Sequence, residues 1–171
     1  MVMQGEGLLS LIYSKRETRN FVETPVADEL VFKVLEAGRL AGSAKNRQPW
    51  VFVLIREKTN LEELAKYGNH AEHLAKASFA VVIAVSDTYI QDRFDAGRAA
   101  QNMMLAAHAL GIGSCPITLH NDEQARKFLN LPEDMKIVVC IAFGYPQPFK
   151  RKGKVIRKTL DQILHLEKYR G

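Results

Sequence analysis

Basic side chains gather near the start of the chain, at a spacing that could bind a phosphate. Lys15, Arg16 and Arg19 offer three cations within five residues. A phosphate monoester carries close to two negative charges, and guanidinium groups give it paired, charge-assisted hydrogen bonds. By composition alone, such a cluster is more often a solvated charged surface. The run KRETRNF at 15–21 is therefore a candidate anion site that needs support from other features.

A second basic stretch, from Lys150 to Lys158, lies near the end of the chain and contains Lys154 and Arg157. Lys plus Arg exceed Asp plus Glu by 24 minus 19, which gives a net charge of +5. This charge favours anionic ligands without requiring a polyanion. A nucleic-acid binder usually combines basic residues with stacking aromatics or a recognisable motif. Only this stretch comes close, so we expect no nucleic-acid partner.

Motifs of other enzyme classes are missing. GIGSCP at 111–116 has Pro116 in place of the third glycine of a dinucleotide fingerprint, and it follows a helix instead of a strand. No GxxxxGK, HExxH or GxSxG element occurs. His70 and His73 lack an obvious third ligand, so we expect no metal and two surface histidines. Cys115 and Cys140 lie in apolar surroundings, which is typical of reduced thiols.

The elements that must position these residues can be read from hydrophobic patterns. An amphipathic helix is expected from Asp28, as its N-cap, to Gly42. Three apolar, β-branched runs predict strands. The second is continuous in its hydrophobicity, so we expect it to be covered on both faces. Helices on both sides of a small sheet indicate the α+β class. The expected strands are Trp50–Ile55, Phe79–Val85 and Lys136–Phe143.

Other helices are predicted with different roles. The helix expected over Asp95–Leu110 has a face of alanine and methionine. Small side chains allow another helix to approach closely, so this face is expected to be a dimer surface, with burial inside one subunit as the alternative. Shorter elements complete the pattern. They are helices at Gly7–Tyr13, Leu61–Lys76 in two pieces, Asp122–Leu129 and Leu160–Leu166, and an extended segment at Cys115–Leu119.

Length and composition bound the class of protein. The 171 residues, with 47% hydrophobic and 25% charged residues, suit one globular domain over 1–171. The longest apolar run, Ala77–Val85, is about half of what a membrane span requires. The first residues lack a basic leading segment. We therefore expect a cytoplasmic protein without a membrane partner.

Five stretches, in order along nearly the whole chain, resemble the successive sequence blocks of the nitroreductase family. The second is the most specific, because the family pattern there has a proline, a serine, a variable pair near an asparagine, and then QPW. The five are KRETRNF at 15–21, AGSAKNRQPW at 41–50, LGIGSCPITL at 110–119, GYP at 144–146 and RKTLDQI at 157–163.

The resemblance implies a three-layer fold with a small mixed or antiparallel sheet and a C-terminal arm. It also implies a homodimer that binds two FMN molecules in its interface, each touched by both subunits. By this resemblance Lys15 faces the phosphate, and Arg157 is the C-terminal phosphate ligand with Lys154 beside it. Arg19 lies near the pyrimidine edge, where a cation stabilises the reduced ring. Arg16 and Glu17 belong to the same block.

The resemblance also assigns two loops to the flavin. Ser43 and Asn46, in the loop that begins at Gly42, reach the flavin of the other subunit. At Pro116, Ile117, Thr118 and Leu119 the family places backbone amides beside the reactive edge, and the Leu119 N–H is the expected donor to N5. Asn69, His70 and His73 lie where some relatives supply another contact. Trp50 is expected in the core.

Two positions depart from the family pattern. Glu17 replaces the usual serine, which places a carboxylate near the phosphate unless the side chain turns outward. Gly42 replaces the usual proline and is expected to loosen its loop. Both changes could weaken the affinity for FMN without changing the mode of binding.

The activity implied is hydride transfer from NAD(P)H through flavin N5 to a small electron-poor acceptor, by a ping-pong mechanism. A nitroaromatic, a quinone or a flavin would serve as acceptor. Larger relatives carry a helical lid where this chain has only 87–94, so substrate choice is expected to rest on Tyr89, Phe94 and His120. A flavin-cleaving or dehalogenating specialist and a non-enzymatic FMN-binding module stay open as alternatives.

Overall fold

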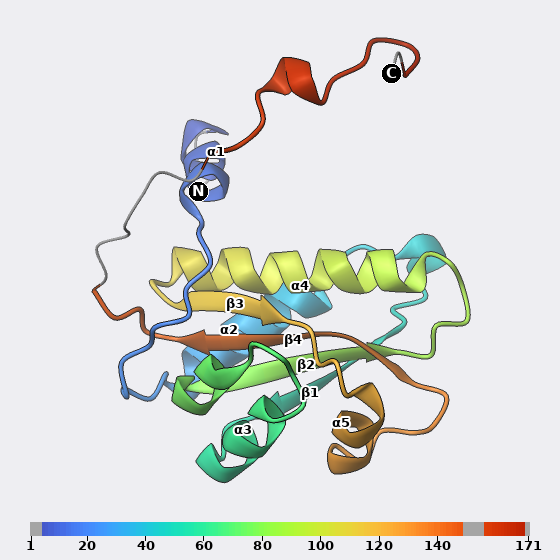
Figure 1. The fold of residues 1–171 in the computed structure, drawn as a ribbon. Coiled ribbons are helices and arrows are strands. Elements are labelled where there is room, and N and C mark those ends of the chain that lie inside the picture. Colours follow the sequence, from blue (N-terminus) through green and yellow to red (C-terminus); the bar gives the residue numbers. More distant parts are fainter. Residues whose placement is uncertain (1–4, 149–155, 170–171) are drawn as a thin grey trace.

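The computed structural model describes residues 5–148 and 156–169. Within them, one four-stranded sheet has the strand order β1 (Trp50–Ile55), β2 (Phe79–Val85), β4 (Lys136–Gly144), β3 (Gly113–Ile117). All three strand pairings are antiparallel. The sheet lies between helices (Figure 1), which confirms the expected α+β class.

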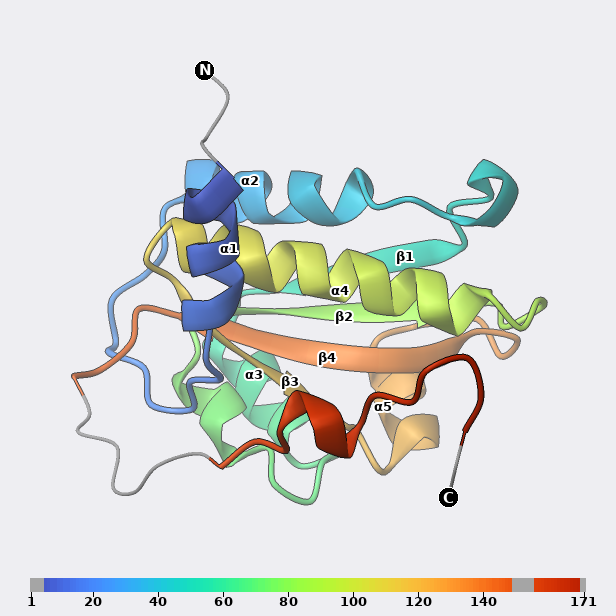
Figure 2. The same cartoon turned by 90° about the horizontal axis from the view of Figure 1, so that it is seen from above.

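Helices cover both faces of the sheet. Figures 1 and 2 show α2 (Asp28–Arg39) and α4 (Asp92–Ala109) on one face. The opposite face carries α3 (Lys58–Ala65), the 3₁₀ turn η2 (Glu72–Lys76) and α5 (Asp122–Phe128). Across the described residues, no helix has the length and apolar character needed to span a bilayer.

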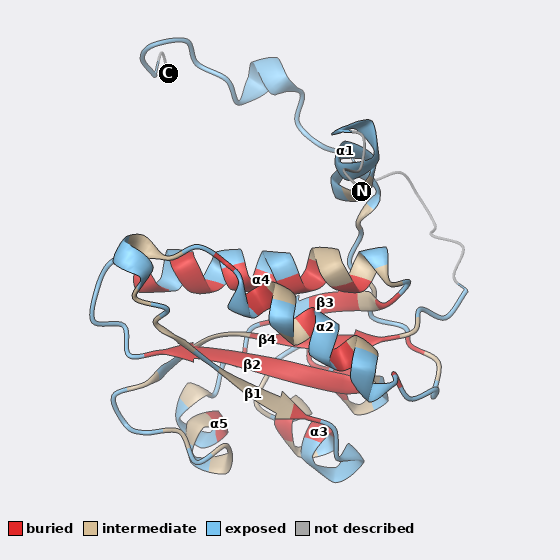
Figure 3. Cartoon of the chain, turned by 180° about the vertical axis from the view of Figure 1, so that it is seen from behind, coloured by how far each residue is buried: buried red, intermediate tan, exposed pale blue. Residues whose placement is uncertain are grey.

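Strand β2 is the centre of the core, as Figure 3 shows. All seven of its residues are buried. Its alternate side chains belong to two different clusters, one against α2 and α4 and the other against α3 and η2. This explains why the strand is continuously apolar, because neither of its faces meets water. Phe79, Val81, Ile83 and Val85 lie in the first cluster, and Ala80 and Val82 in the second.

Helix α4 packs its small side chains inside the subunit. Ala100 and Met103 are buried in the core cluster that also contains Val31 and Val34 of α2. Ala99 is buried as well. A Cβ placed on Gly38 of α2 would lie 2.2 Å from Cε and 2.8 Å from Cγ of Met103, so glycine permits this close approach of the two helices. The expectation that this face forms a dimer surface is therefore wrong. The small residues do permit a close helix contact, but the partner helix is α2.

Several helix boundaries differ from the expected ones, and α2 ends at Arg39 instead of continuing to Gly42. Helix α4 begins at Asp92, three residues earlier than expected. Asp28 is the first helical residue of α2 instead of its N-cap, which is Ala27. The Asp28 carboxylate forms an ion pair with Arg56 after β1, so a contact from a distant strand replaces the local cap.

The two ends of the described chain lie outside the sheet layers (Figure 1). Helix α1 (Gly5–Ser14) confirms the expected N-terminal helix, although none of its residues is buried. The helix expected over 160–166 is only the 3₁₀ turn η3 (Leu160–Gln162). Side chains 156–169 are all exposed. No side chain of this segment is buried, so only local interactions can support a helix there.

Candidate functional site

The segment that follows α1 lies along the start of β3. The backbone N–H of Thr18 donates to the carbonyl of Ser114 at 2.9 Å, and that of Val22 donates to Tyr145 at 3.0 Å. A Cβ on Gly113 would lie 3.0 Å from Cβ of Thr18, so glycine permits this approach. Three of the five sequence blocks, at 15–21, 110–119 and 144–146, are thereby brought together.

Two adjoining cavities open at this junction. The larger has a volume of about 740 Å³ and the smaller about 270 Å³, and they share Arg16, Thr18 and Pro146. The larger volume falls within the range of small-molecule sites. Its lining residues are 16–20 and 146–148. The smaller cavity is lined by 14–16, Thr18, His108, 111–114 and Pro146.

Lys15 is the most enclosed cation of the junction. Its side chain is only 8% exposed, and Nζ lies 2.5 Å from Oε1 of Glu17 and 3.7 Å from Sδ of Met104. The Glu17 side chain is 45% exposed and turns toward Lys15 instead of outward. The departure at Glu17 thus places a carboxylate directly on the lysine that the family resemblance assigns to the phosphate.

The other two cations have different surroundings. Arg16 donates from Nη1 to the carbonyls of Tyr13 at 2.6 Å and Lys15 at 2.7 Å, so it closes the end of α1. Arg19 lies near the thiol of Cys115 and near His73. Burial raises the pKa of the Cys115 thiol, and the Arg19 guanidinium partly offsets that increase. Both cysteines are buried and unpaired by disulfide, as expected.

Two polar atoms near the junction are buried without a hydrogen-bond partner among the described residues: Oγ of Ser114 and Nε2 of His73. Ser114 lines the smaller cavity. Buried polar atoms are rarely left unpaired, so a hydroxyl of this kind at a cavity is available to a ligand. His73 is only 9% exposed, which corrects the expectation that both histidines lie on the surface. His70 is exposed as expected.

Past Ser114, β3 is the edge strand of the described sheet. Pro116 and Thr118 are exposed, whereas the side chains of Ile117 and Leu119 are each 6% exposed and belong to the core on the α3 side. An edge strand presents backbone groups that no neighbouring strand uses. The backbone of 116–119 can therefore meet a ligand while its apolar side chains are buried.

The loop containing Gly42, Ser43 and Asn46 lies at the other end of α4. The backbone N–H of Ala44 donates to Asp95 in the first turns of α4, whereas Ser14 contacts His108 in its last turn. About 20 Å of helix axis separates Asp95 from His108. Within one chain, this loop is therefore not brought together with Lys15.

Gly42 lies against a neighbouring arginine. A Cβ at this position would lie 2.3 Å from Nη2 of Arg98, whose Nη1 is 3.4 Å from Asp95. The loop itself is tightly constrained, because Oγ of Ser43 accepts the N–H of Gln48 at 2.9 Å. Three of its residues, Lys45, Asn46 and Gln48, adopt positive φ. Strained backbone of this kind concentrates at functional sites.

The chain is similar to known proteins over nearly its whole length. The model of the Nitroreductase family matches residues 12–78 and 66–145, which together are most of the chain. The chain belongs to the nitroreductase family. A protein of Archaeoglobus fulgidus, provisionally named as an NADH dehydrogenase/NAD(P)H nitroreductase, is 30% identical over 96% of this chain and 99% of its own length.

A second relative and a solved structure extend the comparison. An NADPH-flavin oxidoreductase of Vibrio harveyi is 29% identical over 81% of this chain and 65% of its own length. The structure of an FMN-dependent nitroreductase from Clostridium difficile has a TM-score of 0.85 and 25% identity. It covers 94% of this chain and 99% of that one. The family resemblance of the sequence blocks and the expected fold are confirmed.

The remaining residues assigned from the nitroreductase family are dispersed. Arg157 is exposed on the C-terminal segment, which extends away from the sheet layers (Figure 1), and Lys154 lies outside the described residues. The Tyr89 ring lies 4.2 Å from the Arg47 guanidinium, at the α4 start. His120 accepts the Asn69 N–H at 3.2 Å. Trp50 packs against the core, as expected.

Sequence reasoning missed the acidic residues that hold the strained loop. Asp92 and Asp95 are 1% and 2% exposed, and Asp92 lies 3.5 Å from Arg47. Asp92 and Asp95 share a helical face with the apolar Ala96 and Ala99, and this spacing could have indicated that the two acids are buried. In the part of the chain that the structure describes, no group of three metal-ligating side chains occurs.

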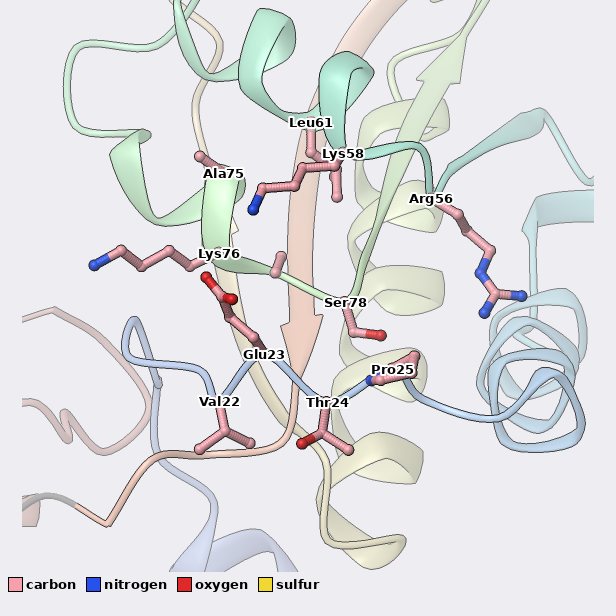
Figure 4. A pocket seen from close by; sticks show the side chains of 11 residues that line it. Val22, Glu23, Thr24, Pro25, Arg56, Lys58, Leu61, Ala75, Lys76 and Ser78 are labelled. Atoms are coloured by element: carbon pink, nitrogen blue, oxygen red, sulfur yellow. The ribbon is translucent and has the colours of Figure 1, made fainter.

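A separate pocket of about 280 Å³ lies between the loop 22–25 and the start of α3 (Figure 4). Lys58, Lys76 and Glu23 supply charges of both signs around it. Arg56 also lines it, but its guanidinium is engaged by Asp28 and by the carbonyl of Val26. None of the residues assigned to the family's flavin site lines this pocket.

Proposed function

We propose that this chain is an FMN-dependent oxidoreductase that transfers hydride from NAD(P)H to a small electron-poor acceptor such as a nitroaromatic, a quinone or a flavin. The observation that carries the proposal is the convergence of the blocks at 15–21, 110–119 and 144–146 on two adjoining cavities of about 740 and 270 Å³. The names of the Vibrio harveyi and Clostridium difficile relatives support the same chemistry.

The residues around the two cavities, together with the basic residues assigned to the C-terminal segment, fit the parts of FMN. Lys15 and Arg157 would hold the phosphate, with Arg16 and Lys154 adding positive charge nearby. Arg19 would lie at the pyrimidine edge, where its charge favours the reduced ring. The unpartnered hydroxyl of Ser114 offers a further hydrogen bond. When bound, FMN supplies the hydride chemistry at N5.

The backbone of β3 and its continuation would orient the ring. Pro116 and Thr118 are exposed, and the edge past Ser114 has no neighbouring strand in the described chain. The N–H of Leu119 is the proposed donor to N5. Because the Leu119 side chain is anchored in the core, its backbone N–H would be held in a fixed position. The proposed chemistry needs no side chain as acid or base.

We also infer that the site is completed by a second copy of the chain. Gly42, Ser43 and Asn46 lie at the end of α4 opposite Lys15, so they would contact the flavin of the partner subunit instead. Apolar side chains of α1 are 48% to 67% exposed, which is unusual for a packed helix and favours a covering partner. These side chains are Leu8, Leu9, Ile12 and Tyr13.

The site would be open and permissive. Only six residues, 86–91, connect β2 with α4 at the end of the helix that would meet the partner's flavin, and Tyr89 and Phe94 there are 53% and 69% exposed. With so little covering structure, the nicotinamide and the acceptor would occupy the same place in turn. This arrangement predicts ping-pong kinetics.

Two measurements test the proposal. Protein purified with added FMN should show the visible absorption of a bound flavin, and NADH or NADPH should bleach it. Steady-state rates at varied nicotinamide and acceptor concentrations should give parallel double-reciprocal lines. Protein that takes up no FMN at millimolar concentration contradicts the proposal, and intersecting lines contradict the shared site.

A further inference from the structure

Lys15 already has a counter-charge within its own chain. Its ammonium lies 2.5 Å from the carboxylate of Glu17, and its side chain is only 8% exposed. The other contact of Nζ is the sulfur of Met104 at 3.7 Å, which carries no charge. The cation assigned to the phosphate is thus neutralised by a residue that also lines the larger cavity.

A phosphate at Lys15 would have to replace this carboxylate. The Glu17 side chain is 45% exposed, so it can turn to solvent when a stronger anion arrives. The exchange loses the ion pair and leaves a negative side chain beside a phosphate of nearly two negative charges. Because Lys15 is enclosed, these interactions are screened less than those between surface charges.

The neighbouring arginines do not remove this competition. Arg16 donates to the carbonyls of Tyr13 and Lys15 at the end of α1, so its guanidinium is partly engaged. Arg19 faces the Cys115 and His73 side of the segment. Lys15 is therefore the cation whose availability Glu17 controls.

We propose that Glu17 is an internal competitor for the phosphate of FMN, so that the flavin exchanges with free flavin instead of being held permanently. This inference rests on the proposed function. It further assigns Glu17 a role in specificity, because riboflavin has no phosphate and meets no competition at Lys15. Glu17 thus reduces the preference of the site for FMN over riboflavin.

The test compares Glu17→Gln with the wild-type chain, using flavin fluorescence quenching to measure the dissociation constants of FMN and riboflavin. Glutamine keeps the size of the side chain and removes its charge. Glu23→Gln, an exposed carboxylate six residues further on and outside the proposed site, is the matched control. Each titration is repeated at low and high salt.

Glu17→Gln should bind FMN about tenfold to a hundredfold more tightly, which corresponds to about 1.4 to 2.8 kcal/mol. Riboflavin affinity should change by less than about threefold, as expected for a ligand without the charge. The gain for FMN should shrink at high salt, since screening weakens the competition. Glu23→Gln should bind both flavins as the wild type does.

Other outcomes overturn the inference in distinguishable ways. Equal FMN affinity in the wild type and Glu17→Gln would show that Glu17 does not compete, while the proposed function stands. Equal gains in affinity for FMN and riboflavin would show that Glu17 acts on the binding of the flavin ring or on folding, and not on the phosphate. A wild-type chain that retains FMN through extensive dialysis would contradict the exchange. Failure of all variants to bind either flavin would remove the proposed function itself.

Discussion

Ala44 and Asp95 are joined by a hydrogen bond of 2.8 Å, from the backbone N–H of Ala44 to Oδ2 of Asp95. The carboxylate is 2% exposed and also lies 3.4 Å from Nη1 of Arg98. This contact ties a loop with three positive-φ residues to the first turns of α4. The positions of Ser43 and Asn46, which are proposed to meet the partner's flavin, therefore depend on a buried acid in another element.

Asp95→Ala should destabilise the protein and loosen this loop. The substitution leaves the partly buried N–H of Ala44 without an acceptor and Arg98 without its counter-ion, at a cost of about 1 to 3 kcal/mol. Urea unfolding followed by circular dichroism measures the change. Asp134→Ala, at an exposed position, serves as the control and should leave the midpoint unaltered. Equal midpoints for both variants would contradict the anchoring role.

His73 should make the folded state sensitive to acid. Burial lowers the pKa of His73, the Arg19 guanidinium lowers it further, and Glu72 opposes them. The folded pKa thus lies below the unfolded value of about 6.5. As the pH falls through that value, the unfolded chain takes up a proton that the native chain does not. The stabilisation is present above this range and is lost below it.

The measurement is the urea midpoint at pH 7.5, 6.0 and 5.0. His73→Gln removes the titrating group, so its midpoint should fall less steeply with acidity than that of the wild type, whatever its absolute stability. His70→Gln, at an exposed position three residues earlier, should follow the wild-type curve. Identical slopes for all three proteins would show that His73 is not buried in its neutral form.

Much of the fold was predictable because the local patterns agree with the tertiary structure. Strand β2 is apolar at every position since both its faces are covered, and the β4 run predicts its strand to within one residue. Where a distant contact decides the outcome, the pattern failed. Asp28 forms an ion pair with Arg56, and Ala27 is the N-cap residue of α2. No local feature of the sequence indicates that ion pair.

The site was predictable to a similar extent. The blocks at 15–21 and 110–119 meet, as the resemblance that assigns both to the flavin implies, and 144–146 lies beside them. The conformation of Glu17, however, depends on the enclosed Lys15 beside Met104, a contact across 89 residues that spacing does not reveal. The burial of His73 was missed for the same reason, because Arg19 and the core around η2 are distant in sequence.

Ala100 tests the corrected role of α4. Ala100→Glu places a carboxylate in the cluster that contains Val34 and Met103, where its desolvation is not compensated by any partner. The variant should therefore fail to fold cooperatively, as measured by thermal melting. Gln101→Glu, at the next and exposed position, should melt as the wild type does. A folded Ala100→Glu monomer with an unchanged melting temperature would restore this face as a dimer surface.

Ile12 tests the alternative surface for association. It is 52% exposed on α1, a helix with no buried residue, and its neighbours Leu9 and Tyr13 are 48% and 67% exposed. If a second copy covers this face, Ile12→Glu should convert the dimer to monomers, because the interface would bury an unpaired charge. The same variant should keep its secondary structure, since Ile12 does not belong to either core cluster. Sedimentation velocity and circular dichroism measure the two properties.

Because Ser43 and Asn46 are proposed to act across the interface, the affinity for FMN should fall together with dimerisation. The control, Lys33→Glu on the exposed side of α2, should leave both the dimer and the FMN affinity intact. A dimer that persists in Ile12→Glu at micromolar concentration would show that α1 does not contribute the interface.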